Sequence, residues 1–274
     1  MSPLYPKEIK QLFSHHGIRA KKYLGQNFLV DQNAIRKILL VAELNKDDVV
    51  IEVGPGLGAL TQEIAPRVKR LIAIEKDRGM FEILKQRIGD FQNIELINED
   101  ILQFDPTYQI RHTPYKVVAS LPYAIATSVI RKFLEAEHQP ESMVLMIQKE
   151  VAQRISAKPP KMNILAVSVQ FYATPKIMAR VSRNSFWPSP RIDSAILKII
   201  PVDTNKNTNV REFFKVVKAG FSQPRKQLAN NLSKELGLEK PQTESWLSQS
   251  NIKPTQRAET LTIQDWINLT IAVK

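Results

Sequence analysis

The feature that most constrains the fold of this chain is an alternation of short β-branched runs with amphipathic segments, between about residues 48 and 147. Such alternation is typical of β-α-β units, in which crossover helices join parallel strands. We therefore expect strands at Val49–Val53, Leu71–Glu75, Ile94–Ile97, Val117–Ser120 and Met143–Ile147. Helices are expected at Ala59–Pro66, Arg78–Ile88 and Ala126–Ala136. The sequence predicts an α/β fold, a doubly wound sheet with helices on both faces.

Three further elements are expected after the fifth strand. Ile164–Tyr172 has a helical pattern and is expected to pack on the sheet. Lys176–Val181 and Ala195–Ile200 flank a proline-rich loop, and we expect them to pair as a hairpin at the sheet edge.

The composition changes after Pro201. The polar stretch D-T-N-K-N-T-N at 203–209 is typical of a linker, and 210–272 has helical patterns throughout. The chain has 274 residues, which exceeds the usual size of one domain. We expect a larger domain at 1–202 and a small all-helical domain at 203–274.

The net charge of +12 is unevenly distributed. Residues 1–150 carry 20 basic against 19 acidic side chains, whereas 151–274 carry 19 against 8. Within the second half, 151–198 has eight basic residues and one acid, Asp193. This imbalance predicts a polyanionic partner. The alternative is a solvated basic face that serves solubility, and an anionic membrane surface is disfavoured because no basic amphipathic helix accompanies the charge.

Several classes of protein are excluded. No apolar run approaches the roughly 20 residues that a membrane span needs, and the first residues lack the apolar core of a secretory signal. There are no cysteines, which excludes disulfides and thiol catalysis. The four histidines do not have metal-ligand spacing, so no metal site is expected. We expect a cytoplasmic protein with no membrane partner.

A glycine-rich turn, G-P-G-L-G at Gly54–Gly58, follows the first expected strand and opens a helix. Glycines allow the backbone to turn tightly and to approach a ligand closely. Glu75 ends the next strand, where it could accept hydrogen bonds from a ribose. A dinucleotide site predicts the same pattern, because Gly54, Gly56 and Ala59 also satisfy G-x-G-x-x-G/A. A turn without a ligand is a third possibility.

Two later strand ends also carry polar groups. The third expected strand ends at N-E-D, so Asp100 could bind an adenine amino group, and the fourth ends at S-L-P-Y (Ser120–Tyr123). The carboxyl ends of parallel strands meet at one edge of a sheet. Pro122 stiffens the turn and leaves Tyr123 free to stack on a planar base, although such a tetrapeptide is often only a structural turn.

Taken together, the motifs resemble those of the S-adenosylmethionine-dependent rRNA adenine N6,N6-dimethyltransferases, and within them the bacterial 16S rRNA enzymes. The resemblance covers nearly the whole chain, and the order of the motifs is more specific than any one of them. The motifs are K-K-Y-L-G-Q-N-F-L-V-D (Lys21–Asp31), E-V-G-P-G-L-G (Glu52–Gly58), I-E-K-D (Ile74–Asp77), N-E-D (Asn98–Asp100), S-L-P-Y (Ser120–Tyr123), Q-K-E-V (Gln148–Val151), F-W-P-S-P-R-I-D-S-A (Phe186–Ala195), F-S-Q-P-R-K (Phe221–Lys226) and R-A-E-T-L (Arg257–Leu261).

The resemblance implies roles for individual residues. The cofactor, S-adenosylmethionine, would be bound by Gln26, Asn27, Leu29, Gly54, Gly56, Glu75, Lys76, Asp100, Ile101 and Ser120. The target adenine would be held by Ser120, the Leu121 carbonyl, Tyr123 and Phe186. The alternative for the two aromatic residues is packing in the core, and Asp31 is also a good N-cap for a helix at 32–42.

The resemblance further implies a Rossmann-like methyltransferase domain and a helical rRNA-binding domain. The implied reaction is dimethylation of two adjacent adenosines near the 3′ end of 16S rRNA, on an immature small ribosomal subunit, by a monomer. The alternatives are a 23S rRNA methyltransferase of the macrolide-resistance type and a non-catalytic rRNA-binding assembly factor. The chain departs from the family pattern at three positions: Ser120 and Ala124 stand where the family usually has asparagine, and Pro224 replaces a basic residue.

Overall fold

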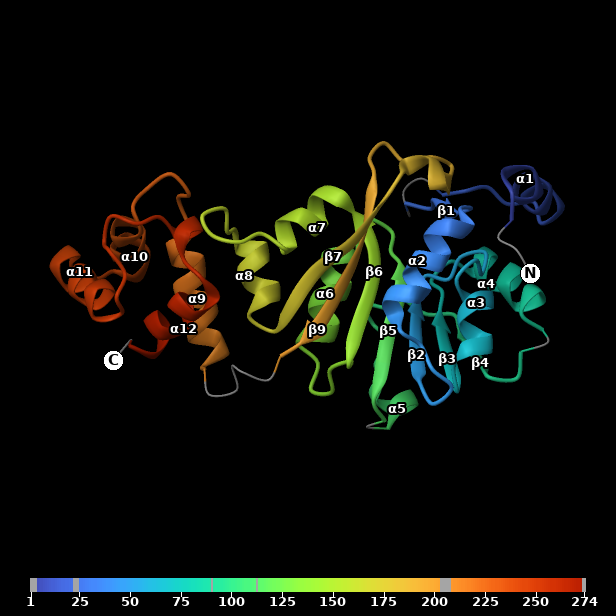
Figure 1. The fold of residues 1–274 in the computed structure, drawn as a ribbon, viewed down its shortest axis with the longest axis horizontal. Coiled ribbons are helices and arrows are strands. Elements are labelled where there is room, and N and C mark those ends of the chain that lie inside the picture. Colours follow the sequence, from blue (N-terminus) through green and yellow to red (C-terminus); the bar gives the residue numbers. More distant parts are fainter. Residues whose placement is uncertain (1–3, 22–24, 90, 112, 203–207, 273–274) are drawn as a thin grey trace. The chain divides into compact units, whose positions relative to one another are not determined.

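The structure is a computed structural model that describes residues 4–21, 25–89, 91–111, 113–202 and 208–272. The chain divides into two compact units (Figure 1). Unit 1 comprises Met1–Ala152 and Lys176–Pro201, and unit 2 comprises Gln153–Pro175 and Val202–Lys274. The end of unit 1 lies next to the expected boundary at 202. However, 153–175 belongs to unit 2, although we expected it in the first domain.

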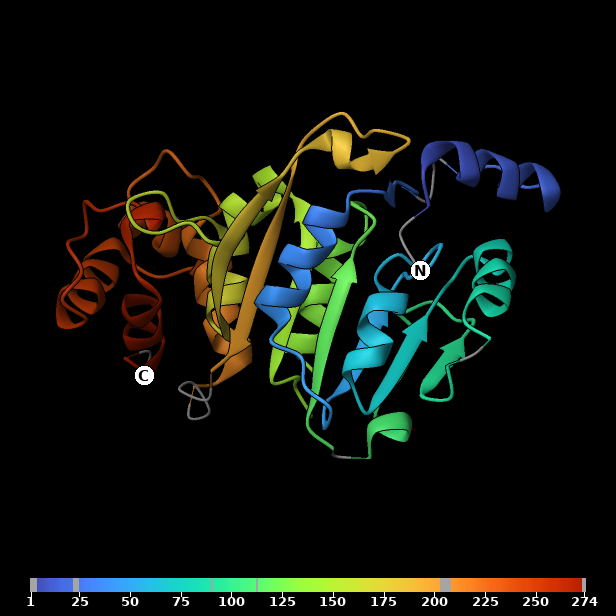
Figure 2. The same cartoon turned by 45° about the vertical axis from the view of Figure 1, so that its right-hand side comes forward.

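The central element is a seven-stranded sheet with the order β4-β3-β2-β5-β6-β9-β7 (Figures 1 and 2). The first five strands in that order are parallel, and β9 pairs antiparallel with β6. The α/β prediction is confirmed, as is a terminal pair of strands at the sheet edge. The strands are β2 (Val49–Val53), β3 (Arg70–Ile74), β4 (Ile94–Ile97), β5 (Tyr115–Ser120), β6 (Ser142–Gln148), β7 (Ala173–Val181) and β9 (Ser194–Pro201).

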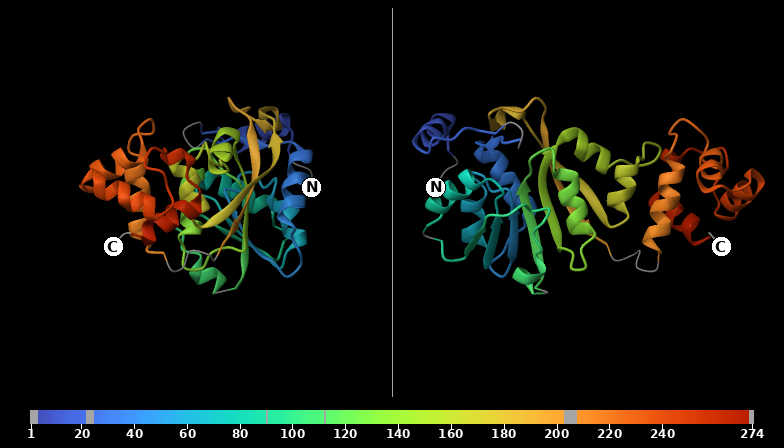
Figure 3. Two further views of the ribbon diagram at one scale, coloured as in Figure 1. Left: turned by 60° about the vertical axis from the view of Figure 1, so that its left-hand side comes forward. Right: turned by 180° about the vertical axis from the view of Figure 1, so that it is seen from behind.

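The sheet is covered on both faces, which explains its apolar strands. All five residues of β2 are buried, as expected for a parallel strand with helices on both sides. On one face Val50, Val118 and Val144 share a buried cluster with Ile35 and Ile38 of α2 (Gln32–Ala42). Helix α6 (Ala126–Leu134) covers the opposite face (Figure 3). Because β2, β3, β4 and β5 are parallel, their carboxyl ends lie at one edge of the sheet.

The helices of unit 1 depart from the sequence prediction at the glycine-rich turn. A helix was expected at Ala59–Pro66, but α3 covers only Thr61–Ile64 and continues as a 3-10 turn, η2 (Ala65–Arg67). Gly58 has a φ of +82°, which keeps the chain out of the helical region just before this point. Pro66 has no N–H to continue α-helical hydrogen bonding. The other helices are α1 (Pro6–His15), α4 (Arg78–Arg87), α5 (Thr107–Ile110) and α7 (Lys149–Ile155), of which the part from Gln153 on belongs to unit 2.

A second, two-stranded sheet joins distant parts of unit 1. Strand β1 (Phe28–Leu29) pairs antiparallel with β8 (Phe186–Trp187), which follows the 3-10 turn η3 (Arg183–Ser185). This pairing was not predicted from the sequence. Asp31, directly after β1, caps α2 as predicted, because its side chain accepts from the Asn33 N–H at 2.8 Å.

Unit 2 is helical, which confirms the helical pattern of the C-terminal segment. Residues 203–207 of the expected linker lie outside the described residues. Helix α8 (Ile164–Gln170) was expected to pack on the sheet, whereas Ala166 and Val167 belong to a buried cluster of unit 2 with Phe213. The remaining elements are α9 (Val210–Gly220), α10 (Leu228–Leu236), α11 (Lys240–Gln249), η4 (Ala258–Thr260) and α12 (Ile263–Ile271). Within the described residues, no helix is both long and apolar enough to cross a membrane.

Candidate active site

The glycine-rich turn after β2 forms one wall of a cavity at the carboxyl edge of the sheet. Gly54, Gly56 and Gly58 all have positive φ, at +64°, +56° and +82°. At Gly58 a Cβ would also lie 2.6 Å from the Leu84 side chain. The backbone N–H of Gly56 donates to Glu75 Oε2 at 3.0 Å. The turn is therefore held by the carboxylate that follows β3.

Glu75 is buried, with 7% of its surface exposed. Its Oε1 accepts from the backbone N–H of Asp77 at 2.7 Å, so each oxygen has a backbone donor. Burial raises the pKa of Glu75, and the donors from Asp77 and Gly56 oppose that rise. A carboxylate fixed in this way can present its remaining lone pairs to the hydroxyls of a ribose.

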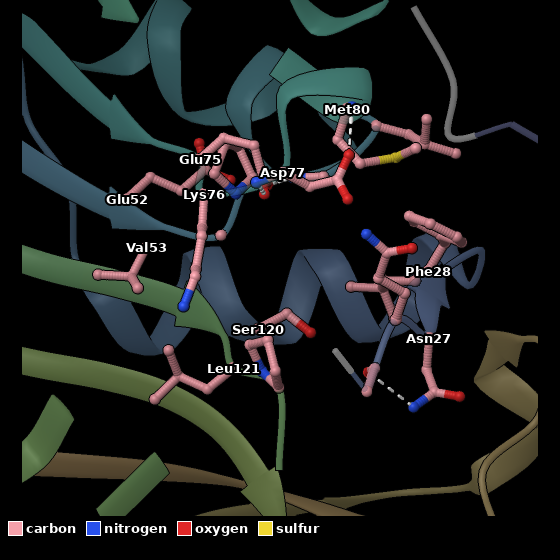
Figure 4. A pocket seen from close by; sticks show the side chains of 18 of the residues that line it. Asn27, Phe28, Glu52, Val53, Glu75, Lys76, Asp77, Met80, Ser120 and Leu121 are labelled. Carbon is pink, nitrogen blue, oxygen red and sulfur yellow. Dashed lines mark hydrogen bonds between the residues drawn. The ribbon is translucent and has the colours of Figure 1, made fainter. Parts of the chain in front are cut away.

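Glu52 is a second buried acid, and in the sequence it lies just before the glycine-rich turn. It is 1% exposed, and its Oε2 has no hydrogen-bond partner among the described residues. Burial, with a contribution from the charge of Glu75, raises the pKa of Glu52 from 4.5 to about 8. Figure 4 shows Glu52 and Glu75 on the same side of the cavity. Glu52 was not among the predicted site residues, although it lies within the glycine motif.

Asp77 also lines the cavity without having been predicted there. It begins α4 by accepting from the Met80 N–H at 3.0 Å, and it pairs with Lys21 Nζ at 2.7 Å. Burial alone would raise the pKa of Asp77, but the ammonium of Lys21 and the Met80 donor outweigh it and lower the pKa. Its position two residues after Glu75 in the I-E-K-D motif was the available signal.

Asp100, after β4, lies where the sequence analysis expects an adenine acceptor. Lys76 Nζ donates to Asp100 Oδ2 at 2.8 Å, and the backbone N–H of Leu102 donates to Oδ1 at 3.0 Å. The hydrogen bond from Lys76 lowers the pKa of Asp100, so the carboxylate stays charged at neutral pH. Ile101, 4% exposed, adds an apolar surface beside it.

The turn after β5 supplies the facing wall. The backbone N–H of Leu121 donates to the Met146 carbonyl at 3.0 Å, which fixes the turn against β6. The Tyr123 hydroxyl lies 3.0 Å from Ser194 Oγ, and burial raises the pKa of Tyr123. Phe186 is 6% exposed and is packed in the core cluster of unit 1, yet it also lines the cavity. Both aromatic rings therefore combine a packing role with access to the cavity.

These walls enclose a cavity of about 330 Å³, within the range of small-molecule sites. Glu75 and Lys76 lie on one side of it, and Ser120 and Leu121 on the other (Figure 4). Residues 22–24 of the predicted motif at 21–31 lie outside the described residues. All predicted site residues line the cavity: Gln26, Asn27, Leu29, Gly54, Gly56, Glu75, Lys76, Asp100, Ile101, Ser120, Leu121, Tyr123 and Phe186.

The polar groups of this cavity discriminate between the two cofactors that the glycine pattern allows. Five acidic side chains line it, against two basic ones, Lys76 and Arg87. One of the five, Glu52, has a pKa of about 8 and is therefore largely protonated at neutral pH. A dinucleotide pyrophosphate needs free backbone N–H groups at the glycine turn, but the Gly56 N–H points at the Glu75 carboxylate. S-adenosylmethionine carries a cationic sulfonium and an ammonium group, so the residues present fit it and do not fit NAD.

Comparison with known proteins identifies the family. The sequence profile of the family described as "Ribosomal RNA adenine dimethylase" matches residues 17–273. The chain belongs to this family. The predictions of a methyltransferase and of S-adenosylmethionine as its cofactor are thereby confirmed.

Named relatives of this ribosomal RNA adenine dimethylase agree with the family. A protein from Dehalococcoides mccartyi named "Ribosomal RNA small subunit methyltransferase A" is 43% identical over 98% of this chain and 93% of its own length. A crystal structure of a dimethyladenosine transferase from Plasmodium falciparum has a TM-score of 0.75 and 25% identity, over 87% of this chain and 94% of that one. The crystal structure of the 23S rRNA methyltransferase ErmE has a TM-score of 0.74 at 24% identity, over 90% and 99% of the chains, which shows a shared fold.

This ribosomal RNA adenine dimethylase also exposes cations beside the cavity-lining loop. Arg180 at the end of β7, Arg183 in η3 and Arg191 in the following loop are all exposed. Arg183 Nη1 donates to the Arg191 carbonyl at 3.3 Å, and the Arg183 N–H donates to Asp193 at 3.1 Å. Arg183 and Arg191 therefore lie on the two sides of Phe186 in the chain, and a hydrogen bond of the Arg183 side chain connects them.

Proposed function

We propose that this enzyme dimethylates N6 of two adjacent adenosines near the 3′ end of 16S rRNA, during maturation of the small ribosomal subunit. The observation that carries the proposal is a cavity that combines buried carboxylates at the glycine turn with the Ser120–Tyr123 turn facing them. The names of relatives that are about 40% identical support the small subunit as the source of the RNA.

The adenine end of the site would orient a weak nucleophile. The N6 lone pair is delocalised into the ring, so attack requires both N6 hydrogens to be held and the amine to become pyramidal. In our proposal Ser120 Oγ and the Leu121 carbonyl accept these hydrogens. Tyr123 and Phe186 stack on the base after it leaves its RNA structure. Both acceptors are neutral, so the site requires no strong base.

The opposite end would hold the methyl donor. We propose that Glu75 binds the ribose hydroxyls, Asp100 and Ile101 bind the adenine, and the turn at Gly54 and Gly56 runs beneath the methionine part. Gln26, Asn27 and Leu29 would close over it, with Lys76 beside Asp100 and Ser120 at the reacting end. When bound, S-adenosylmethionine supplies a methyl group on a sulfonium, a strong electrophile that needs no further activation.

The basic residues would bind the RNA backbone. Phosphate contacts from Arg180, Arg183 and Arg191 would place the RNA at the cavity, with a salt-dependent affinity. We propose that the helical C-terminal part, 203–274, adds a second rRNA contact through its own positive charge. We further propose that the protein acts as a cytoplasmic monomer.

A methyl-transfer assay tests the proposed function. Immature small subunits, large subunits and naked 16S rRNA are each incubated with radiolabelled S-adenosylmethionine, and the modified nucleosides are identified by mass spectrometry. The expected result is dimethyladenosine in the small-subunit RNA. Label in 23S rRNA would indicate the macrolide-resistance type of activity, and rRNA binding without label would indicate a non-catalytic assembly factor. A Gly56→Asp variant, which fills the turn beside Glu75, serves as the inactive control.

A further inference from the structure

The two-residue ladder between β1 and β8 joins the two halves of the proposed site. Phe28 is paired with Trp187 and Leu29 with Phe186, although the strands are far apart in sequence (Figure 2). Leu29 lies in the segment proposed to close over the cofactor, and Phe186 is proposed to stack on the target adenine. Because the pairing fixes the register of the two strands, the backbone position of Phe186 depends on that of Leu29, and the reverse.

Two hydrogen bonds extend this ladder past its end. The backbone N–H of Val30 donates to the Ser185 carbonyl at 2.9 Å. The Ser185 hydroxyl donates to Asp31 Oδ2 at 2.7 Å. A pair of two-residue strands is marginally stable in water, so these contacts contribute a large part of what holds the ladder together.

The bond between Ser185 and Asp31 is a strong one. Ser185 is 6% exposed, and its hydroxyl faces a carboxylate, a charge-assisted geometry that is stronger than a neutral hydrogen bond. The same hydrogen bond is the largest contribution that lowers the pKa of Asp31. The other oxygen of Asp31 accepts from the N–H groups of Asn33 and Ala34 at 2.8 and 3.4 Å. One carboxylate therefore fixes the start of α2 with one oxygen and the Phe186 loop with the other.

We infer that Ser185 and Asp31 are positioning residues, which couple cofactor binding to target-RNA binding by holding β8 against β1. This inference rests on the proposed function, because it takes the cofactor and the adenine as the two ligands. Closure of the Asn27–Leu29 segment over the cofactor would set Phe186 in place for the adenine. The coupling must be reciprocal: each ligand tightens the binding of the other by the same factor.

The test measures this factor by binding alone. The dissociation constant of immature small subunits is measured by filter binding, with and without saturating S-adenosylhomocysteine, which cannot react. We expect at least a fivefold tightening in the full wild-type chain, the low end of typical coupling. In Ser185→Ala the factor should fall to within about twofold of unity, while the affinity for S-adenosylhomocysteine alone changes less than about threefold.

Matched variants separate coupling from folding. Ser182→Ala removes a hydroxyl of the same loop that accepts from the Asn184 N–H and has no contact with Asp31, so it should keep the wild-type factor. Ser185→Thr retains the hydroxyl and should restore coupling. If Ser185→Ala does not fold, Asp31→Asn is measured in its place. Asparagine still caps α2 well but loses the charge that faces Ser185, so the coupling factor of Asp31→Asn should also fall.

A wild-type factor of one, or a full factor in Ser185→Ala or in a folded Asp31→Asn, would overturn the inference. The proposed function fails on a different measurement. A wild-type chain that binds subunits but transfers no methyl group would contradict the proposed reaction, whatever the coupling factor.

Discussion

The two ends of the cavity are built differently. At the glycine turn, both oxygens of Glu75 have backbone donors, and Glu52 is buried beside them. At the turn after β5, no hydrogen bond holds the Ser120 hydroxyl within the described part of the chain, and Ser120 is only partly buried. The proposed cofactor end is thus organised before a ligand arrives, whereas the proposed adenine end keeps an acceptor available.

The difference indicates where each kind of defect should be measured. Groups that the protein holds in place before binding contribute to the affinity for a small ligand, because little order has to be created when the ligand binds. Groups with available lone pairs acquire partners only when the flipped adenine enters, so they contribute to the rate of transfer. Substitutions at the glycine end should change affinity for S-adenosylmethionine, and substitutions at the β5 end should change single-turnover rates.

The largest effect is expected from the titration of Glu52. Its folded pKa of about 8 lies above the ordinary 4.5. Below the ordinary pKa both states are protonated; between the two values only the unfolded chain releases the proton. The free energy of unfolding should therefore fall as the pH rises from about 4.5 to about 8, by on the order of 1.4 kcal/mol per unit of pKa difference.

Denaturant unfolding at several pH values measures this effect. Glu52→Gln keeps the shape without the titrating proton, so its stability should change less over the same pH range. If the free energy of unfolding depends on pH in the same way in the wild type and in Glu52→Gln, the elevated pKa of Glu52 is contradicted.

Glu75→Ala should abolish tight cofactor binding. It removes the proposed acceptor of the ribose hydroxyls and also the group that holds the backbone N–H groups of Gly56 and Asp77 in place. A hydrogen bond to a charged acceptor contributes about 1.5 to 3 kcal/mol. We expect S-adenosylmethionine to bind at least about 100-fold more weakly by calorimetry. Glu95→Ala, at a half-exposed ion pair with Arg70, is the control and should leave the affinity unchanged. Equal affinity of Glu75→Ala and wild type would show that the turn does not depend on this carboxylate.

Asp100→Ala should weaken cofactor binding by a smaller amount. The Asp100 side chain is 19% exposed, so water can replace part of what is lost. A hydrogen bond to a charged acceptor contributes about 1.5 to 3 kcal/mol, which corresponds to roughly tenfold or more in affinity. Lys76→Met removes the ion pair but keeps the Asp100 carboxylate. It should therefore reduce the affinity for S-adenosylmethionine less than Asp100→Ala does. NAD should bind to neither variant nor to the wild type, and calorimetric binding of NAD would refute the assignment of the cofactor.

Tyr123→Ala tests the other end of the cavity. Loss of a stacking surface costs about 1 to 3 kcal/mol, so the single-turnover rate should fall while cofactor affinity changes less than about threefold. Tyr123→Phe removes the hydrogen bond to Ser194 but keeps the ring, and it should retain most of the rate. A drop in cofactor affinity equal to the drop in rate would erase the contrast between the two ends.

The smallest effect is expected at Ser120. Ser120→Ala should reduce transition-state stabilisation by about 1 to 2 kcal/mol, because in the proposed site the Leu121 carbonyl would still accept one N6 hydrogen. Ser120→Asn, which restores the residue usual in the family, should raise the ratio of dimethyladenosine to monomethyladenosine in mass spectrometry. If Ser120→Ala and Tyr123→Ala both leave rate and product ratio unchanged, the turn is structural and a non-catalytic role becomes the better interpretation.

The sequence by itself determined the strands of the sheet and the residues at their carboxyl ends. Val49–Val53 and Ile94–Ile97 have the predicted bounds, because short runs of β-branched and other apolar residues are recognisable as strands from their own side chains. Asp31 was predictable as a cap because the backbone N–H groups that donate to its carboxylate lie only two and three residues further along the chain. The parallel order then brings Glu75, Asp100 and Ser120 to one edge, a general property of such sheets.

Tertiary structure alone decided the contacts between residues far apart in the chain. No local pattern pairs Leu29 with Phe186 or joins Asp31 to Ser185. Helix α8 has a helical pattern that is compatible with either unit, and its membership of unit 2 depends on residues such as Phe213. The pKa of Glu52 depends on burial by a surrounding core. Periodicity records which face of an element is apolar, but the partner of that face is chosen by the packing of the whole chain.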